Sequence, residues 1–197
     1  TIYMESTPNP EVMKFVANKI LTEDSIELLN NKNSDQVPLA MELFKFPFIK
    51  SIFISYNFIS ITKNNDFDWY EISTEIRQFI HNYLNQNGFV NNFKSYANTE
   101  VKSKNDDVIE DAAIDTKNLS DIEKEIVSII NQYIQPAVAA DGGSIVFKSY
   151  EDGIVYVILK GACSGCPSST ITLKQGIENL LKQKLGSQIK EVTAYNG

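Results

Sequence analysis

The sequence predicts an α/β (α+β) chain built from two small mixed domains that are joined by a flexible acidic linker. Its 197 residues suit one large domain or two small ones. Segments with helical and with strand periodicity alternate along the chain. Residues 96–117 interrupt this pattern, because they lack an apolar period and carry three lysines against six acids. We therefore expect domains at residues 1–95 and 118–197, with a short helix at 108–114 as an alternative for part of the linker.

The first domain is expected to combine short strands with one long helix. Its shorter elements are a strand at 13–16, a helix at 38–45, and a hairpin of strands at 48–55 and 58–63. The long helix covers residues 71–86, where apolar side chains recur at helical spacing, and Gly88 is expected to end it. Its apolar stripe consists of Ile72, Ile76, Phe79, Ile80 and Tyr83.

The second domain is predicted to have the order α-β-β-α-β. Ser120 and Glu123 form a capping box at the start of its first helix, and Pro136 is expected to end that helix. The remaining elements are a strand at 144–149, a hairpin turn at 151–153, a strand at 154–160, a loop at 161–169, a helix at 170–185 and a strand at 189–194.

Composition excludes several classes of function. The net charge is −7 and Arg77 is the only arginine, which argues against nucleic-acid binding, because that binding depends on neutralising phosphates. No run approaches the ~18 apolar residues that span a bilayer, so no membrane association is expected. Residues 1–15 are polar and contain two prolines, so we do not expect a signal peptide there.

The chemistry is expected at the only two cysteines, Cys163 and Cys166, in a C-x-x-C-P arrangement between a strand and a helix. Pro167 and the serines after it are typical of a helix start, whose free N–H groups and dipole favour thiolates. Small neighbouring residues let the backbone approach a ligand closely. These are the conditions that an anionic iron–sulfur cluster prefers.

Three interpretations of this cysteine pair compete. It can be half of a four-thiolate site shared by two chains, a dithiol–disulfide redox pair, or two ordinary thiols at a turn. The small residues Ser164 and Gly165 and the preceding hairpin favour the first over a thioredoxin-like site. A single-chain metal site is disfavoured, because the only histidine, His81, is expected at the surface of the helix at 71–86.

Motifs in both domains resemble one known family. Asp141-Gly142-Gly143, the loop GACSGCPSS at 161–169 and TLKQGIE at 172–178 closely resemble the C-terminal domain of NifU and of the Nfu-type iron–sulfur cluster carriers. Thr7-Pro8-Asn9-Pro10, the run at 58–69 ending in Trp69, and the shorter motifs Lys14-Phe15, Pro38-Leu39-Ala40 and Leu43-Phe44 resemble the N-terminal domain that accompanies it in Nfu proteins.

The resemblance implies a carrier that is not an enzyme. Such proteins accept a [4Fe–4S] cluster, sometimes [2Fe–2S], from an upstream scaffold protein and pass it to apo-target proteins. The cluster bridges two subunits, so Cys163 and Cys166 are expected to be its only protein ligands in each chain of a homodimer. The alternatives are a thiol–disulfide oxidoreductase and a zinc-binding dimeric interaction module. Reduced thiols place the protein in the cytoplasm, or in the mitochondrial matrix if a transit peptide has been removed.

Overall fold

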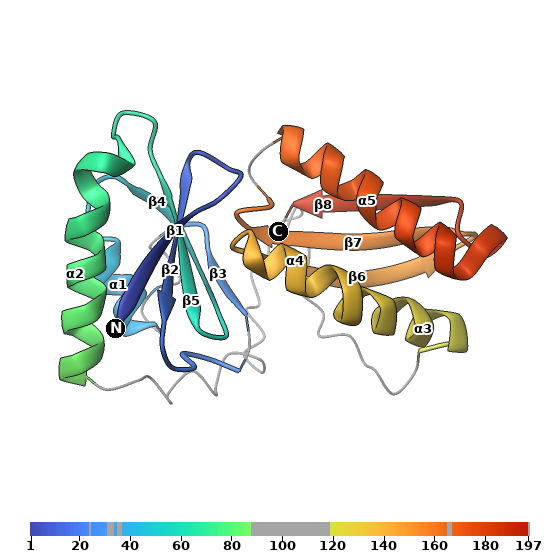
Figure 1. Cartoon of the computed structure of the whole chain (residues 1–197), viewed down its shortest axis with the longest axis horizontal. Coiled ribbons are helices and arrows are strands. Elements are labelled where there is room, and N and C mark those ends of the chain that lie inside the picture. The colour runs from blue at the N-terminus through green and yellow to red at the C-terminus, as the bar shows by residue number, and fades with distance from the viewer. Residues whose placement is uncertain (24, 31–33, 35–36, 88–118, 165–166, 197) are drawn as a thin grey trace, which may run out of the picture. The chain divides into compact units, whose positions relative to one another are not determined.

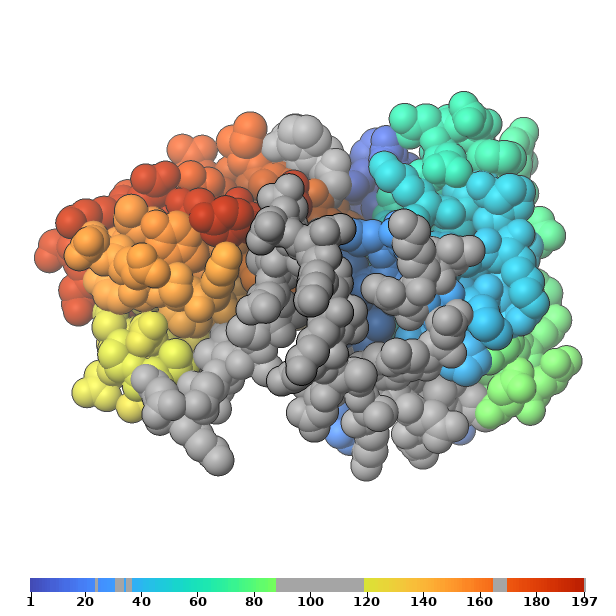
Figure 2. All heavy atoms as spheres, turned by 180° about the vertical axis from the view of Figure 1, so that it is seen from behind, coloured from blue at the N-terminus to red at the C-terminus, as the bar shows by residue number. Residues whose placement is uncertain are grey.

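The computed structural model describes residues 1–23, 25–30, 34, 37–87, 119–164 and 167–196, and Figure 2 draws the remaining residues in grey. The chain divides into two compact units, Thr1–Thr99 and Glu100–Gly197. Each unit combines strands and helices, which confirms the α+β class (Figure 1). The predicted linker at 96–117, the alternative helix at 108–114 and Gly88 lie outside the described residues, so the predicted domain limits stay a prediction. Within the described part of the chain, no helix is both long and apolar enough to cross a membrane.

Unit 1 is built on a five-stranded antiparallel sheet in the order β1-β2-β5-β4-β3. The strands are β1 (Ile2–Ser6), β2 (Val12–Ala17), β3 (Ile26–Leu28), β4 (Ile49–Ser55) and β5 (Phe58–Lys63). The helices are α1 (Pro38–Leu43) and α2 (Trp69–Asn87). Helix α2 lies along one face of the sheet and buries its apolar stripe there (Figure 1). Trp69 is buried in the same core.

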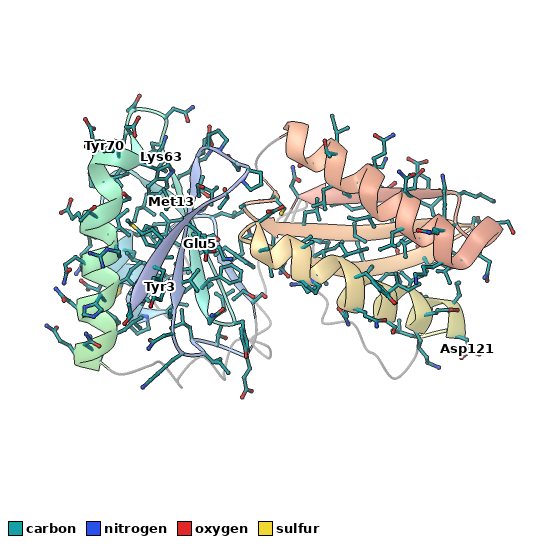
Figure 3. All side chains as sticks on the ribbon, viewed as in Figure 1. Tyr3, Glu5, Met13, Lys63, Tyr70 and Asp121 are labelled. Carbon is teal, nitrogen blue, oxygen red and sulfur yellow. The ribbon has the colours of Figure 1, made fainter. Side chains whose placement is uncertain are left out.

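Most of the elements predicted for unit 1 are confirmed, including the hairpin of β4 and β5 and the long helix, which begins two residues earlier than expected. Strands β1 and β3 were not predicted. Both are edge strands, and β1 buries only Ile2, so Tyr3 and Glu5 are exposed along its length (Figure 3). An edge strand with one buried side chain has no apolar alternation from which it can be recognised.

The first helical segment of unit 2 corrects one prediction, because the chain stays helical past Pro136. Helix α3 (Asp121–Ile129) starts with the predicted capping box of Ser120 and Glu123. A π-helical turn, η3 (Ile130–Ile134), follows, and α4 (Gln135–Ala140) continues with Pro136 in its first turn. A proline at this position is tolerated, because the first N–H groups of a helix need no intrahelical partner. The wider turn before it absorbs the missing hydrogen bond.

The rest of unit 2 is a three-stranded sheet in the order β6-β7-β8, with both long helical segments on one face. Strands β6 (Gly143–Glu151) and β7 (Ile154–Gly161) form the predicted antiparallel hairpin. Helix α5 (Pro167–Leu185) and the short 3₁₀ turn η4 (Gly186–Gln188) then cross over to β8 (Glu191–Asn196), which runs parallel to β7. The predicted order α-β-β-α-β is confirmed, with the first helix divided by its π turn.

Candidate functional site

The candidate site is the loop that connects β7 to α5. Strand β7 ends at Gly161, whose φ of 67° is a left-handed conformation suited to glycine. Helix α5 starts at Pro167, three residues before the predicted start at 170, in agreement with the helix-start character of Pro167 and the serines after it. Cys163 lies in this loop. Cys166 lies outside the described residues, so its ligand role stays a prediction. The loop is therefore the first connection of the parallel crossover β7-α5-β8. Cys163 lies two residues beyond the end of β7.

Four hydrogen bonds hold the described part of the loop. The Ala162 amide donates to the Gly142 carbonyl oxygen at 3.2 Å, which ties the loop to the segment before β6. The Ser164 amide and its Oγ both donate to the Gly161 carbonyl oxygen, at 3.1 and 2.8 Å. Thr170 Oγ1 donates to the Cys163 carbonyl oxygen at 3.1 Å, which ties the loop to α5. Cys163 is thus anchored from three elements.

Gly143 leaves the space that the Cys163 side chain fills. It is opposite Gly161 in the β6–β7 ladder. A Cβ added at Gly143 would lie 2.7 Å from Cys163 Sγ and 2.7 Å from the Lys160 carbonyl oxygen, closer than real Cβ atoms approach other atoms. The sequence indicated only a turn at Asp141-Gly142-Gly143. In the structure Gly142 forms that turn with a φ of 82°. At position 143 a glycine is needed for a different reason, because a Cβ there would collide with the side chain of Cys163.

The Cys163 thiol is buried in the core of unit 2, with 6% of the residue exposed. Burial, and secondarily the negative charge of Asp141, raises the pKa of this thiol to about 11. This direction is opposite to the stabilised thiolate that the sequence suggests. Loss of hydration therefore favours the neutral form of this thiol.

The motif TLKQGIE attaches α5 to the edge of the sheet. Glu178 Oε2 accepts a hydrogen bond from the Val192 amide of β8 at 3.1 Å, and its Oε1 accepts one from Lys182 Nζ at 2.6 Å. The hydrogen bonds from Lys182 and Val192 hold the pKa of Glu178 below its ordinary value. Lys174 Nζ pairs with Glu191 at 3.1 Å. These residues fix the helix that follows the cysteine loop.

His81 is not part of this site. It lies half-buried on α2 of unit 1, where the Asn85 side-chain amide is 3.2 Å from its Nε2. Among the described residues, no three His, Cys, Asp or Glu side chains gather in a way that could hold a metal ion. Cys163 is therefore the one predicted ligand whose position the described residues establish.

Comparisons with known proteins agree in both units. The family model described as "Scaffold protein Nfu/NifU N terminal" matches residues 2–87, and the model described as "NifU-like domain" matches residues 126–193. The human "NFU1 iron-sulfur cluster scaffold homolog, mitochondrial" is 32% identical over 183 residues, which cover 92% of this chain and 66% of that protein. The Drosophila sechellia protein of the same name is 30% identical over 184 residues, covering 92% of this chain and 60% of that protein.

The chain thus spans less than two thirds of the length of these curated relatives. Among solved structures, the NifU-like protein from Saccharomyces cerevisiae is similar at 24% identity and a TM-score of 0.40, covering 44% of this chain and 79% of that one. These values are low, and the assignment rests on the sequence matches. Those matches lie in both units and in the same order, so the chain belongs to the Nfu family, with an Nfu N-terminal domain followed by a NifU-like domain.

Proposed function

We propose that this protein is an iron–sulfur cluster carrier that binds a [4Fe–4S] or [2Fe–2S] cluster between two copies of the chain and delivers it to apo-proteins. Cys163 and Cys166 are the ligands that each copy supplies. The observation that carries the proposal is the position of Cys163 in a loop built around it, in a domain of the NifU-like family. The relatives are themselves named iron–sulfur cluster scaffold homologs.

The number of ligands requires two copies. Both cluster types are usually held by four thiolates, and the chain has two cysteines. The single histidine is on α2 of unit 1, beside Asn85. Two chains that bring their cysteine loops together complete the set, so the cluster-loaded form is a homodimer.

The burial of Cys163 suits a site that is filled and emptied. A thiol must lose its proton when it binds iron, so loading releases protons. Burial holds Cys163 in the protonated form until iron compensates for the charge of the thiolate. When the cluster leaves, Cys163 takes up a proton again and returns to its buried, neutral form. This lowers the free-energy cost of passing the cluster to a thiol-rich target.

The burial of Cys163 also weighs against one of the two alternatives. A thiol–disulfide oxidoreductase needs an accessible attacking cysteine of low pKa, whereas Cys163 is buried and its pKa is raised. A structural zinc site also takes four ligands and contributes to folding when bound. Zinc therefore stays the second alternative, and metal analysis of the reconstituted chain distinguishes it from an iron–sulfur cluster.

The experiment is anaerobic reconstitution of the full chain with iron and sulfide, followed by metal and sulfide analysis and by sedimentation. We expect a brown dimer with about four iron atoms per two chains for [4Fe–4S], or about two for [2Fe–2S]. Cys163→Ser and Cys166→Ser should each abolish the coloured dimer. Ser164→Ala, which changes the same loop without removing sulfur, should retain it. A Cys163→Ser chain that still binds a normal cluster would refute the proposal, as would a colourless wild-type dimer holding one zinc.

Delivery to an apo-protein should be stoichiometric, because a carrier gives up its cargo once per loading and does not turn over as an enzyme does. The donor is an upstream scaffold protein and the recipient is an apo iron–sulfur protein. We place this exchange in a compartment that keeps thiols reduced, either the cytoplasm or the mitochondrial matrix. Transfer from the reconstituted dimer to an apo-ferredoxin tests this: the cluster gained by the ferredoxin should equal the cluster lost by the dimer, and a dimer that keeps its cluster in the presence of excess apo-ferredoxin would contradict it.

A further inference from the structure

The outer face of α5 is unlike the exposed faces of the other long helices. This face consists of the exposed residues of the helix between positions 170 and 183, all of which are uncharged: Ile171, Thr172, Gln175, Gly176, Asn179 and Gln183. Ile171 is the most notable member, since 66% of this isoleucine is exposed. On α2, by contrast, the exposed residues include Glu71 and Glu75, and on α3 they include Asp121 (Figure 3).

The charged residues of α5 border this face or lie beyond its C-terminal end, and each has a partner of its own. Lys174 pairs with Glu191 of β8, and Lys182 pairs with Glu178 along the helix. Lys184 Nζ lies 4.6 Å from the centre of the Tyr133 ring. A solvent-exposed helical face usually carries charged side chains. An uncharged face that includes an exposed isoleucine is therefore a candidate surface for contact with another protein.

Gly176 supports the same interpretation. It lies in the interior of α5, where glycine is less favourable than alanine, and a Cβ at this position would meet nothing within 4 Å. Nothing in the described part of this chain therefore explains the absence of a side chain. A partner that approaches the helix backbone closely would explain it, because glycine permits such an approach.

We infer that the outer face of α5 is the surface on which the second copy of this chain packs when the two copies share a cluster. The inference rests on the proposed function. Helix α5 begins at the residue that follows Cys166, so a cluster bridging two cysteine loops brings the starts of both α5 helices together. Thr172 and Gly176 lie within about 15 Å of that start along the helix axis, at about 1.5 Å per residue.

The uncharged character of the face fits a second copy in particular. In a two-fold symmetric dimer each surface meets its own copy, so a charge near the axis meets a like charge and repels it. The chain carries a net charge of −7, and a face without charge avoids this repulsion. Helices that pack against one another lie about 8–10 Å apart, a distance that the short side chain of Thr172 and the bare backbone of Gly176 allow.

The test compares three variants of the full chain after anaerobic reconstitution, with dimerisation followed by sedimentation and cluster content by absorbance. Ile171→Lys places a charge on the proposed interface and should weaken the cluster-loaded dimer by roughly tenfold or more. Gly176→Ala should weaken the dimer too, yet raise the thermal midpoint of the apo-protein, because alanine favours the helix and has open space. Ile20→Lys is the matched control, since Ile20 is 52% exposed in unit 1, and it should leave the dimer unchanged.

The outcomes separate this inference from the proposed function. Wild-type protein that stays monomeric and colourless overturns both. A wild-type cluster-loaded dimer that Ile171→Lys and Gly176→Ala form equally well overturns the interface alone. Variants that form the dimer normally but deliver the cluster slowly to an apo-protein also overturn it, because the face would then dock the target. Circular dichroism of each apo-variant verifies that the fold is intact.

Discussion

Replacing Gly143 by alanine tests whether this glycine is required by its contact with Cys163. The added Cβ would lie 2.7 Å from Cys163 Sγ and 2.7 Å from the Lys160 carbonyl oxygen. The cysteine could turn away, but the carbonyl belongs to the β7 backbone and can move only if the ladder opens. Overpacking of this kind costs about 1–3 kcal/mol. Alanine also restricts the unfolded chain, which returns about 0.4–1 kcal/mol.

The net expectation is a loss of about 1–2 kcal/mol from the free energy of unfolding of unit 2. For a domain of this size each kcal/mol shifts the thermal midpoint by about 4–8 °C, so the transition of unit 2 should fall by roughly 4–16 °C. Gly176→Ala is the matched control: it makes the same chemical change where no atom lies within 4 Å. It should raise the midpoint by a few degrees, given a gain of about 0.5–1 kcal/mol.

Calorimetry of the full chain measures both transitions, and fluorescence identifies them. Trp69 is the only tryptophan and belongs to unit 1, so its emission should report a transition that neither substitution moves. A Gly143→Ala protein whose unit 2 transition stays in place, or rises as in Gly176→Ala, would show that Gly143 is not required by the contact with Cys163. A Trp69 transition that moves by the same amount would contradict this account too, because the effect would then not be local to unit 2.

Two further predictions concern titration. The folded pKa of Glu178 is lowered, so its ionised form contributes stability above the ordinary carboxyl pKa of about 4.3, and this is lost as the pH falls through the folded pKa. Glu178→Gln should therefore lower the free energy of unfolding, measured with denaturant, by about 1 kcal/mol at pH 7. At low pH the free energies of unfolding of the variant and the wild type should converge. An equal difference at every pH would contradict this. In apo Cys166→Ser, Cys163 should be about 0.1% thiolate at pH 8, against about 24% for an unperturbed thiol of pKa 8.5, because its pKa is about 11. Alkylation by iodoacetamide should be roughly 200-fold slower than for a free thiol, and a rate equal to that of the denatured variant would refute the burial.

Local signals in the sequence were sufficient for the elements that follow a regular pattern. The apolar stripe of α2, the capping box at Ser120 and the glycine-containing turns all lie where they were predicted. Pro136 was misjudged because a proline ends a regular α-helix, whereas here a π turn places it in the first turn of the next segment. The widening that allows this depends on packing of the whole helical segment, which no short window of sequence contains.

The contact between Gly143 and Cys163 depends on the register of β6 and β7. Counting back along both strands from the turn at Glu151 and Ile154 would place Ser144 opposite Gly161. A bulge between Phe147 and Ser149 shifts the ladder by one residue and puts Gly143 there instead. The sequence contains both motifs, but the irregularity that brings them together leaves no clear pattern in it. The burial that raises the pKa of Cys163 follows from the same arrangement.

The two outer strands of the unit 2 sheet each have a backbone N–H occupied by a helix side chain. Gln135, at the end of the π turn, accepts the Ile145 amide of β6 at 3.0 Å, and Glu178 accepts the Val192 amide of β8 at 3.1 Å. Free strand edges pair readily with other chains and promote aggregation. The dimer proposed here for the loaded form requires that further copies do not join through the sheets. The π turn places Gln135 against β6, where its side chain occupies a backbone N–H of that edge strand. This contact therefore helps to keep the strand edges from pairing with other copies of the chain.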